Sequence, residues 1–186
     1  MPGFDAELIE RAKKMEVEGI GDLMNMEEED RNSLLRISES DMERLATICN
    51  RLPVVELSYE VKKADQNDKS KEFQIGETLN LIVTVIRDEE EEEALQAFTQ
   101  PVFAQFFPEK KMEEWWLIVG HVKSGKVLCN RKITDEFRAV QSVRKKLSFE
   151  IEDVGEDEFA EFRLYLICDS YIGCDMEEDF KIKIAK

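Results

Sequence analysis

The apolar residues of the first fifty positions recur at intervals of about three and four, which is the period of an α-helix. A first stripe follows Asp5, a residue type that caps helices, and it ends before a Gly-Ile-Gly break at 19–21. A second stripe follows Ser38 and ends at Pro53, which cannot continue a helix. The stripes consist of Leu8, Ile9, Ala12 and Met15, and of Met42, Leu45, Ala46 and Cys49. The pattern predicts three or four short helices before residue 53.

Beyond Pro53 the period changes to two. Val55, Leu57 and Tyr59 alternate with polar residues, which is typical of a strand with one buried face. Similar segments recur along the rest of the chain, and we expect about seven strands without long helices between them. These strands cover 54–61, 78–86, 115–122, 126–133, 145–151, 162–169 and 180–184. The prediction is an α+β chain with a small helical domain at 1–52 and an antiparallel β-sandwich at 53–186.

Two segments interrupt the alternating pattern. The polar segment 62–73 is expected to be a mobile loop, whereas 87–116 begins with an acidic run and continues with aromatic residues between two prolines. The second segment is too long for a hairpin, so we expect a crossover on the sandwich with Phe103, Phe106 and Phe107 buried beneath it. A partner-binding surface built from the same aromatic residues is the other interpretation.

Trp115 and Trp116 are neighbours on a predicted strand, so their side chains point to opposite faces of the sheet. At most one of them belongs to the core. The other is either covered by the aromatic crossover or available to anchor a partner. The candidate partner-binding residues are therefore Trp115, Trp116, Phe106 and Phe107.

The charge balance is strongly acidic, with 42 acidic and 26 basic residues and a formal net charge of −16. Such a surface repels phosphates, which disfavours nucleic acid as the principal ligand and favours a protein partner. A local basic patch stays open as an alternative, because net charge does not exclude one. Its candidate members are Lys13 and Lys14, or Arg131, Lys132, Arg138, Arg144, Lys145 and Lys146.

Known catalytic and metal-binding motifs are not readable in the sequence. It contains no phosphate-binding loop, GxSxG elbow, HExxH helix or EF-hand loop, and the single histidine, His121, follows an apolar strand. None of the four cysteines belongs to a CxxC pair, so they are expected to be buried thiols. We predict no catalytic residue, metal or cofactor. Because no long apolar run or signal peptide is readable, we expect an intracellular protein that does not contact a membrane.

The stretch LICDSYIGCDMEEDF, residues 166–180, holds two cysteines and five acidic residues and so resembles a metal or redox site. Its acidic residues do not follow the spacing of a known cation loop, so they are expected to be turn formers and solvated charges. Cys168 continues the core face of a strand, DSYIG turns the chain, and Tyr171 is a candidate corner tyrosine. Cys168 and Cys174 lie on either side of the turn and are expected to remain reduced.

Several stretches together resemble the end of a Sec-sixty-three homology unit, in the matching order and over nearly the whole chain. They are RNSLLRISESDMERLATICNRLPVVELSYEV, EEWWLIVG, KLSFEI and YLICDSYIGCDMEEDFKIKI. The resemblance is closest to the unit in the C-terminal cassette of spliceosomal Ski-two-like RNA helicases of the Brr type. This closest resemblance rests on three features: CNRLPVVELSYEV, the Trp pair after Glu113 and Glu114, and DSYIGCD. The DSYIGCD signature, expected to be structural, comprises Asp169, Ser170, Tyr171, Gly173, Cys174 and Asp175.

The resemblance implies a helix-loop-helix domain at 1–52 and an immunoglobulin-like or fibronectin type III-like β-sandwich at 53–186. It implies a nuclear parent protein, an ATP-dependent RNA helicase that unwinds the U-four/U-six duplex in pre-mRNA splicing. This part of the parent carries no ATP-binding motif, so it is implied to be a non-catalytic platform for splicing-factor proteins and the rest of the helicase chain. Two alternatives stay open: weak contact of the helical part with single-stranded RNA, and the equivalent module of the translocon component of the endoplasmic reticulum.

Overall fold

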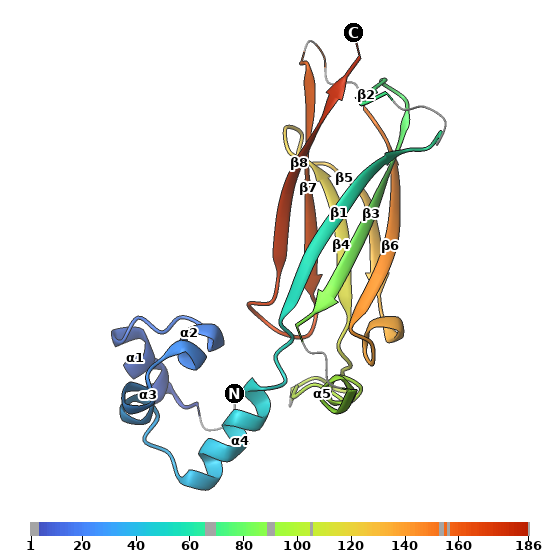
Figure 1. Ribbon diagram of the computed structural model, residues 1–186. Helices are drawn as coiled ribbons and strands as arrows, with labels where there is room; N and C mark the ends of the chain where they lie inside the picture. The colour runs from blue at the N-terminus through green and yellow to red at the C-terminus, as the bar shows by residue number, and fades with distance from the viewer. Residues whose placement is uncertain are drawn as a thin grey trace. The chain divides into compact units, whose positions relative to one another are not determined.

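The computed structural model (Figure 1) describes residues 4–65, 70–88, 92–104, 106–152, 155 and 157–185. The chain divides into two compact units, Met1–Leu52 and Pro53–Lys186. Within the described residues, the first unit has four α-helices, and the second has a fifth α-helix and two sheets with eight strands in all. The predicted α+β class is therefore confirmed. No helix in the described ranges has the length and apolar character needed to span a membrane.

The described helices of the first unit are α1 (Ala6–Lys14), α2 (Ile20–Asn25), α3 (Glu28–Leu35) and α4 (Glu39–Cys49). Of these, α1 and α4 begin at polar caps. The backbone amide of Leu8 donates to Asp5 Oδ1 at 2.8 Å, and that of Asp41 donates to Ser38 Oγ at 3.2 Å, so both predicted caps are confirmed. The first glycine of the Gly-Ile-Gly segment, Gly19, is the residue before α2.

The core of the first unit is narrower than the predicted stripes. It consists of Leu8, Ala12, Leu23, Leu34, Leu35, Leu45 and Cys49. Ile9 and Met15 are exposed, contrary to the prediction. Ile9 lies about 100° around the helix from Leu8, and Met15 follows the end of α1 at Lys14. Ala46 is likewise exposed on α4.

The second unit consists of two sheets with mainly antiparallel pairing. Its strands are β1 (Val55–Lys63), β2 (Glu72–Phe73), β3 (Thr78–Arg87), β4 (Trp115–His121), β5 (Val127–Ile133), β6 (Ser142–Glu150), β7 (Phe159–Cys168) and β8 (Met176–Ile184). One sheet has the order β1-β3-β6 and the other β2-β8-β7-β4-β5. Only β2 runs parallel to its neighbour, β8, among the pairs that the structure describes.

Three predicted strands begin too late and one strand was missed. β6, β7 and β8 start three or four residues earlier than expected, in segments that mix polar and apolar residues. Each of these segments is paired with a neighbouring strand, so hydrogen bonding extends the strand beyond its apolar pattern. β2 lies in the segment predicted to be a loop, because Glu72 and Phe73 pair with Lys183 and Ile184.

Both sheets contribute to one apolar core. The inward positions of β3, β4 and β7 are buried and include Leu79, Leu81, Val83, Val85, Leu117, Val119, Leu164 and Leu166. Burial of each such side chain contributes about 1.5–3 kcal/mol before entropy is counted. The alternation predicted from the sequence therefore identifies the core face of each of these strands.

The crossover between β3 and β4 packs differently from the prediction. It contains α5 (Glu92–Ala97), and its buried side chains are those of Leu95, Phe98 and Val102. The residues expected beneath it are instead exposed: Phe103 at 48%, Phe106 at 93% and Phe107 at 51%. The helical turn and the following residues place the earlier apolar group against the sheets, which leaves the later aromatic group in solvent.

A buried ion pair holds the two ends of this crossover together. Arg87, at the end of β3, is 1% exposed, and Glu113, before β4, is 2% exposed. Arg87 Nη2 donates to Glu113 Oε1 at 2.5 Å, and the same oxygen accepts from Trp115 Nε1 at 2.6 Å. The guanidinium carbon lies 4.0 Å from the ring centre of Phe98 and 4.1 Å from that of Phe137.

The guanidinium also reaches the connection between β5 and β6. Its Nε and Nη2 donate to the backbone oxygen of Phe137, at the end of the short 3-10 helix η1 (Asp135–Phe137), at 3.3 and 3.2 Å. Arg138 Nε in turn donates to the backbone oxygen of Glu113 at 3.1 Å. The Arg87 side chain thus connects β3, the residue that follows α5, η1 and the segment that leads into β4.

Arg87→Met is expected to lower the free energy of unfolding by about 3–5 kcal/mol, because the Glu113 carboxylate stays buried without its cation. Urea denaturation monitored by tryptophan fluorescence measures the loss. The double variant Arg87→Met/Glu113→Gln should recover part of it, since no net charge then remains buried.

The matched control is Arg163→Met, which removes the exposed pair between Arg163 and Asp179 at 2.5 Å. It should cost about 1 kcal/mol or less, as exposed pairs do. Equal losses in Arg87→Met and Arg163→Met would contradict a special role for the buried pair.

Candidate functional site

The predicted aromatic site is divided between the core and the surface. Trp115 is 1% exposed and belongs to the core, whereas Trp116 on the other face of β4 is half-buried. The Lys132 ammonium lies 5.5 Å from the centre of the Trp116 ring. Phe106 and Phe107 are exposed on the crossover. The opposite-face prediction for the two tryptophans is confirmed, and three of the four candidate residues, Trp116, Phe106 and Phe107, reach solvent.

A cluster of charges surrounds the outer face of β4 beside Trp116. Glu114 Oε2 lies 2.7 Å from Lys132 Nζ and 3.0 Å from Lys111 Nζ, and Lys111 Nζ also lies 2.9 Å from Asp169 Oδ1. Hydrogen bonding from Lys132, followed by that from Lys111, lowers the pKa of Glu114 to about 2. Lys132 and Arg138, proposed for a basic patch, therefore lie among carboxylates, with Arg138 Nη2 3.8 Å from Glu114.

The turn after β7 is tied to the segment that leads into β4. Asp169 donates its backbone N–H to the backbone oxygen of Glu114 at 3.1 Å, and Ser170 Oγ donates to the backbone oxygen of Met112 at 3.0 Å. Asp175 Oδ1 accepts from the backbone amide of Cys168 at 2.8 Å. Gly173 has φ +88°, a conformation that glycine adopts readily, and Tyr171 packs against the core. These contacts favour a structural role for the DSYIGCD signature.

The four cysteines are free thiols; Cys49 and Cys168 are buried as predicted, whereas Cys129 and Cys174 are half-buried, contrary to the prediction. Burial raises the pKa of Cys168 to about 12, and that of Cys129 and Cys174 to about 11. Thiols with such pKa values are protonated at neutral pH and are poor nucleophiles. His121 lies in the β4–β5 hairpin, where its Nδ1 is 2.8 Å from Ser124 Oγ. No group of three or more His, Cys, Asp or Glu side chains suited to a metal ion occurs in the described ranges.

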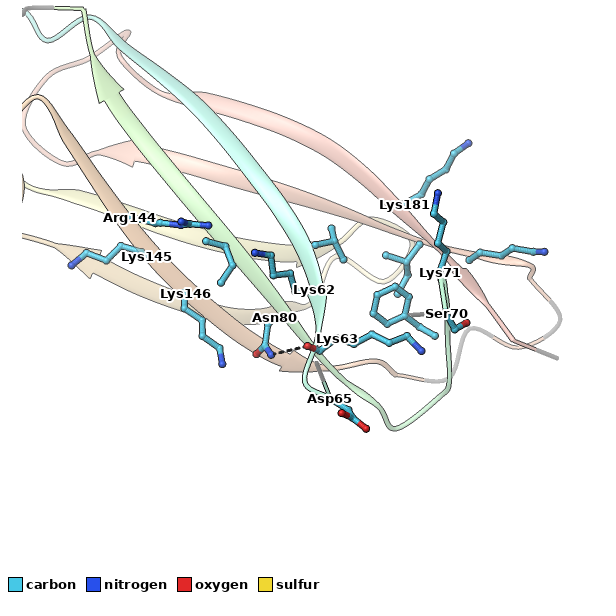
Figure 2. A pocket seen from close by; sticks show the side chains of 15 residues that line it. Lys62, Lys63, Asp65, Ser70, Lys71, Asn80, Arg144, Lys145, Lys146 and Lys181 are labelled. Carbon is cyan, nitrogen blue, oxygen red and sulfur yellow. Dashed lines mark hydrogen bonds between the residues drawn. The ribbon is translucent and has the colours of Figure 1, made fainter. Parts of the chain in front are cut away.

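A second surface feature is an open cleft of about 960 Å³, which we call the basic cleft. Figure 2 shows its lining, which comes from β1, β3, β6, β8 and the residues around β2. Eight of its fifteen lining residues are basic, and one, Asp65, is acidic. The basic residues are Lys62, Lys63, Lys71, Arg144, Lys145, Lys146, Lys181 and Lys183.

Strand pairing brings these basic residues together. The outer face of β3 aligns Ile82 with Lys146 of β6, and Asn80 with Lys62 of β1. Asn80 is buried between them, where its Oδ1 accepts from Ser148 Oγ at 2.7 Å and its Nδ2 lies 3.5 Å from the oxygen of Lys63. The sheet therefore joins lysines that are more than eighty positions apart in the sequence.

The sequence predicted only part of this cleft. Arg144, Lys145 and Lys146 line it as members of the proposed basic patch, whereas Arg131 only donates to the backbone oxygen of Lys146, at 3.5 Å. Lys13 belongs to the first unit, where it pairs with Glu10 at 2.9 Å. The missed residues are Lys62, Lys63, Lys71, Lys181 and Lys183. In the last strand, Lys181 and Lys183 alternate with apolar residues, which indicates a row of lysines on one face of that strand. The sequence does not show which strands lie beside this row.

Comparison with known proteins adds the family. The family model described as Sec63 Brl domain matches residues 10–181. The chain belongs to this family. The predicted resemblance to a Sec-sixty-three unit is thereby confirmed. The family match covers the charge cluster, the DSYIGCD signature and all of the lining of the basic cleft except Ile182 and Lys183.

Relatives of this Sec63 chain include U5 ribonucleoprotein helicases and a pre-mRNA-splicing factor. It is 34% identical over its whole length to the U5 small nuclear ribonucleoprotein 200 kDa helicase of Drosophila melanogaster and to that of Homo sapiens. It is 28% identical to the pre-mRNA-splicing factor brr2 of Schizosaccharomyces pombe. In each case the chain spans 8% of the length of the relative.

Glu114→Gln is expected to change how stability depends on pH. The folded-state pKa of about 2 lies below the ordinary value of 4.5, so the stabilisation from Glu114 is present above pH 4.5 and is lost as the pH falls toward 2. Near pH 7 the variant should be less stable by about 1 kcal/mol, and near pH 2 it should equal the parent. Urea denaturation across this range measures the difference.

Glu109→Gln is the control, because Glu109 is an exposed carboxylate on the same crossover. Its effect should be small at every pH. A deficit of Glu114→Gln that stays constant from pH 7 to pH 2 would show that the ion pairs are not its cause.

Proposed function

We propose that this chain is a protein-interaction and regulatory module, without catalytic activity of its own, in a nuclear ATP-dependent RNA helicase of the spliceosome. Membership of the Sec63 Brl domain family supports the proposal, as do relatives that are a U5 ribonucleoprotein helicase and a pre-mRNA-splicing factor. The partners are splicing-factor proteins and the rest of the helicase chain. The parent protein acts in pre-mRNA splicing by unwinding the U-four/U-six RNA duplex.

We infer further that Met1–Leu52 is the helix-loop-helix domain and Pro53–Lys186 an immunoglobulin-like or fibronectin type III-like β-sandwich. The strand order supports this. When the two-residue β2 is set aside, the first, second and fifth strands form one sheet and the remaining four form the other. Immunoglobulin-type sandwiches divide strands A, B and E from C, F and G in the same way. A sandwich of this kind offers rigid turns and edges for docking a partner.

The observation that carries the interaction role is the exposure of three aromatic residues on one segment. We call Phe103, Phe106 and Phe107 the aromatic loop. The burial of Leu95, Phe98 and Val102 anchors the preceding part of the crossover. Exposed aromatic side chains on an anchored segment are suited to protein binding, because they bury large areas with few rotatable bonds.

Phe106→Asp/Phe107→Asp tests this role in the full-length helicase. Affinity purification should recover at least one U5 ribonucleoprotein partner about thirtyfold less well, because loss of one central aromatic anchor costs about 2 kcal/mol. RNA-stimulated ATP hydrolysis by the same preparation should be unchanged. The 186-residue chain alone should hydrolyse no ATP.

The matched control is Ile75→Asp/Ile172→Asp, which places two carboxylates at exposed apolar residues in other turns. It should leave partner recovery unchanged. Recovery of every U5 partner at the parental level with the aromatic-loop variant would refute the proposal, and so would ATP hydrolysis by the chain alone.

A further inference from the structure

The basic cleft is an anomaly in a chain whose formal net charge is −16. We propose that it binds an acidic polypeptide segment in an extended conformation, in which carboxylate side chains alternate with aliphatic ones. The inference rests on the proposed function in one respect, that the ligand is a protein. The surface is not the aromatic loop, and the two are tested by different variants.

Three lysines of the cleft are available to an external anion. The other five basic residues already have carboxylate partners: Lys62 and Arg144 share Glu60, Lys63 pairs with Glu77, Lys145 with Glu136 and Lys183 with Glu72. Lys71, Lys146 and Lys181 are exposed and have no carboxylate partner among the residues that the structure describes. Their ammonium groups are therefore the positive charges that a ligand can neutralise.

The floor of the cleft is aliphatic. Ile82 is half-buried on the outer face of β3, where it is aligned with Lys146 of β6. Val61 is half-buried on the core face of the edge strand β1 and lines the cleft from there. A ligand that carries only charges would leave these side chains in water. An alternating acidic and aliphatic segment would place carboxylates on the exposed lysines and an aliphatic side chain on Ile82.

The same lining disfavours single-stranded RNA. The only aromatic ring in the lining, Phe73, is buried, and Lys63 lies 5.1 Å from its centre, so a base has no exposed ring on which to stack. The single arginine, Arg144, is paired with Glu60 at 3.2 Å.

Free strand edges beside the cleft favour an extended ligand. Within the described pairings, β1 pairs only with β3, and β2 covers β8 only at Lys183 and Ile184. Lys62 and Lys181 belong to these edge strands. A segment that adds to such an edge gains main-chain hydrogen bonds and presents alternate side chains to the cleft.

Binding can be measured by fluorescence anisotropy with the 186-residue chain. The probes are a labelled peptide of about ten residues in which Glu and Val alternate, the same peptide with Lys in place of Glu, and an oligouridine of about ten nucleotides. At about 50 mM NaCl the Glu peptide should bind more tightly than either other probe. At about 300 mM NaCl its affinity should fall.

Lys146→Glu/Lys181→Glu should weaken binding of the Glu peptide by about tenfold. Lys14→Glu/Lys110→Glu makes the same charge change at exposed lysines outside the cleft and should leave the affinity within about twofold of the parent. The single variant Lys71→Glu, in the segment before β2, tests the cleft without altering a strand. Thermal melting checks that each variant is folded.

Absence of Glu-peptide binding at low salt would overturn the inference, as would equal losses in the cleft and control variants. Oligouridine bound more tightly than the peptide, and released by the cleft variants, would assign the cleft to RNA instead. Recovery of U5 partners by the helicase depends on the aromatic loop in the earlier test. If the Glu peptide does not bind the cleft but the aromatic-loop variant loses partner recovery, only the cleft assignment is contradicted.

Discussion

The Arg87–Glu113 ion pair is the interaction on which the rest of the second unit depends. Both side chains are almost fully buried, and a buried charge is tolerated only when a partner and hydrogen bonds compensate for the lost water. The buried Arg87 guanidinium therefore requires several contacts at once. They are the Glu113 carboxylate, the rings of Phe98 and Phe137, and the Phe137 backbone oxygen. That requirement fixes where the crossover leaves β3 and where it re-enters the sheet at β4.

The surface beside β4 follows from this arrangement. With Glu113 and Trp115 turned inward, the alternation of an extended chain turns Glu114 and Trp116 outward. Glu114 then meets Lys111, Lys132 and, through them, Asp169 of the DSYIGCD turn. The signature is thus held by the same segment that carries the buried carboxylate. The acidic and polar residues of the signature form hydrogen bonds and ion pairs that hold the turn after β7 to the segment before β4. These structural bonds account for residues that in the sequence resemble a metal or redox site.

The distribution of charge separates two surfaces with different chemistry. Around Trp116, lysines and carboxylates neutralise one another, so this surface offers an aromatic ring among paired charges. In the basic cleft, strand pairing brings together more basic side chains than the neighbouring carboxylates can neutralise. A net charge of −16 describes neither surface, because a ligand responds to the charges within about a Debye length of its own.

Local patterns in the sequence determined the helices, their caps, the strand faces and the family. These properties depend on neighbours along the chain: Asp5 and Ser38 cap the turns that follow them, and the alternation from Leu164 to Cys168 selects the buried face of β7. Tertiary structure alone decided the pairing of Arg87 with Glu113, the early starts of β6 and β8, the exposure of Phe106, and the gathering of Lys62, Lys146 and Lys181. The physical reason is that charges and backbone hydrogen-bonding groups act across space, and their partners are distant in sequence until the sheets form.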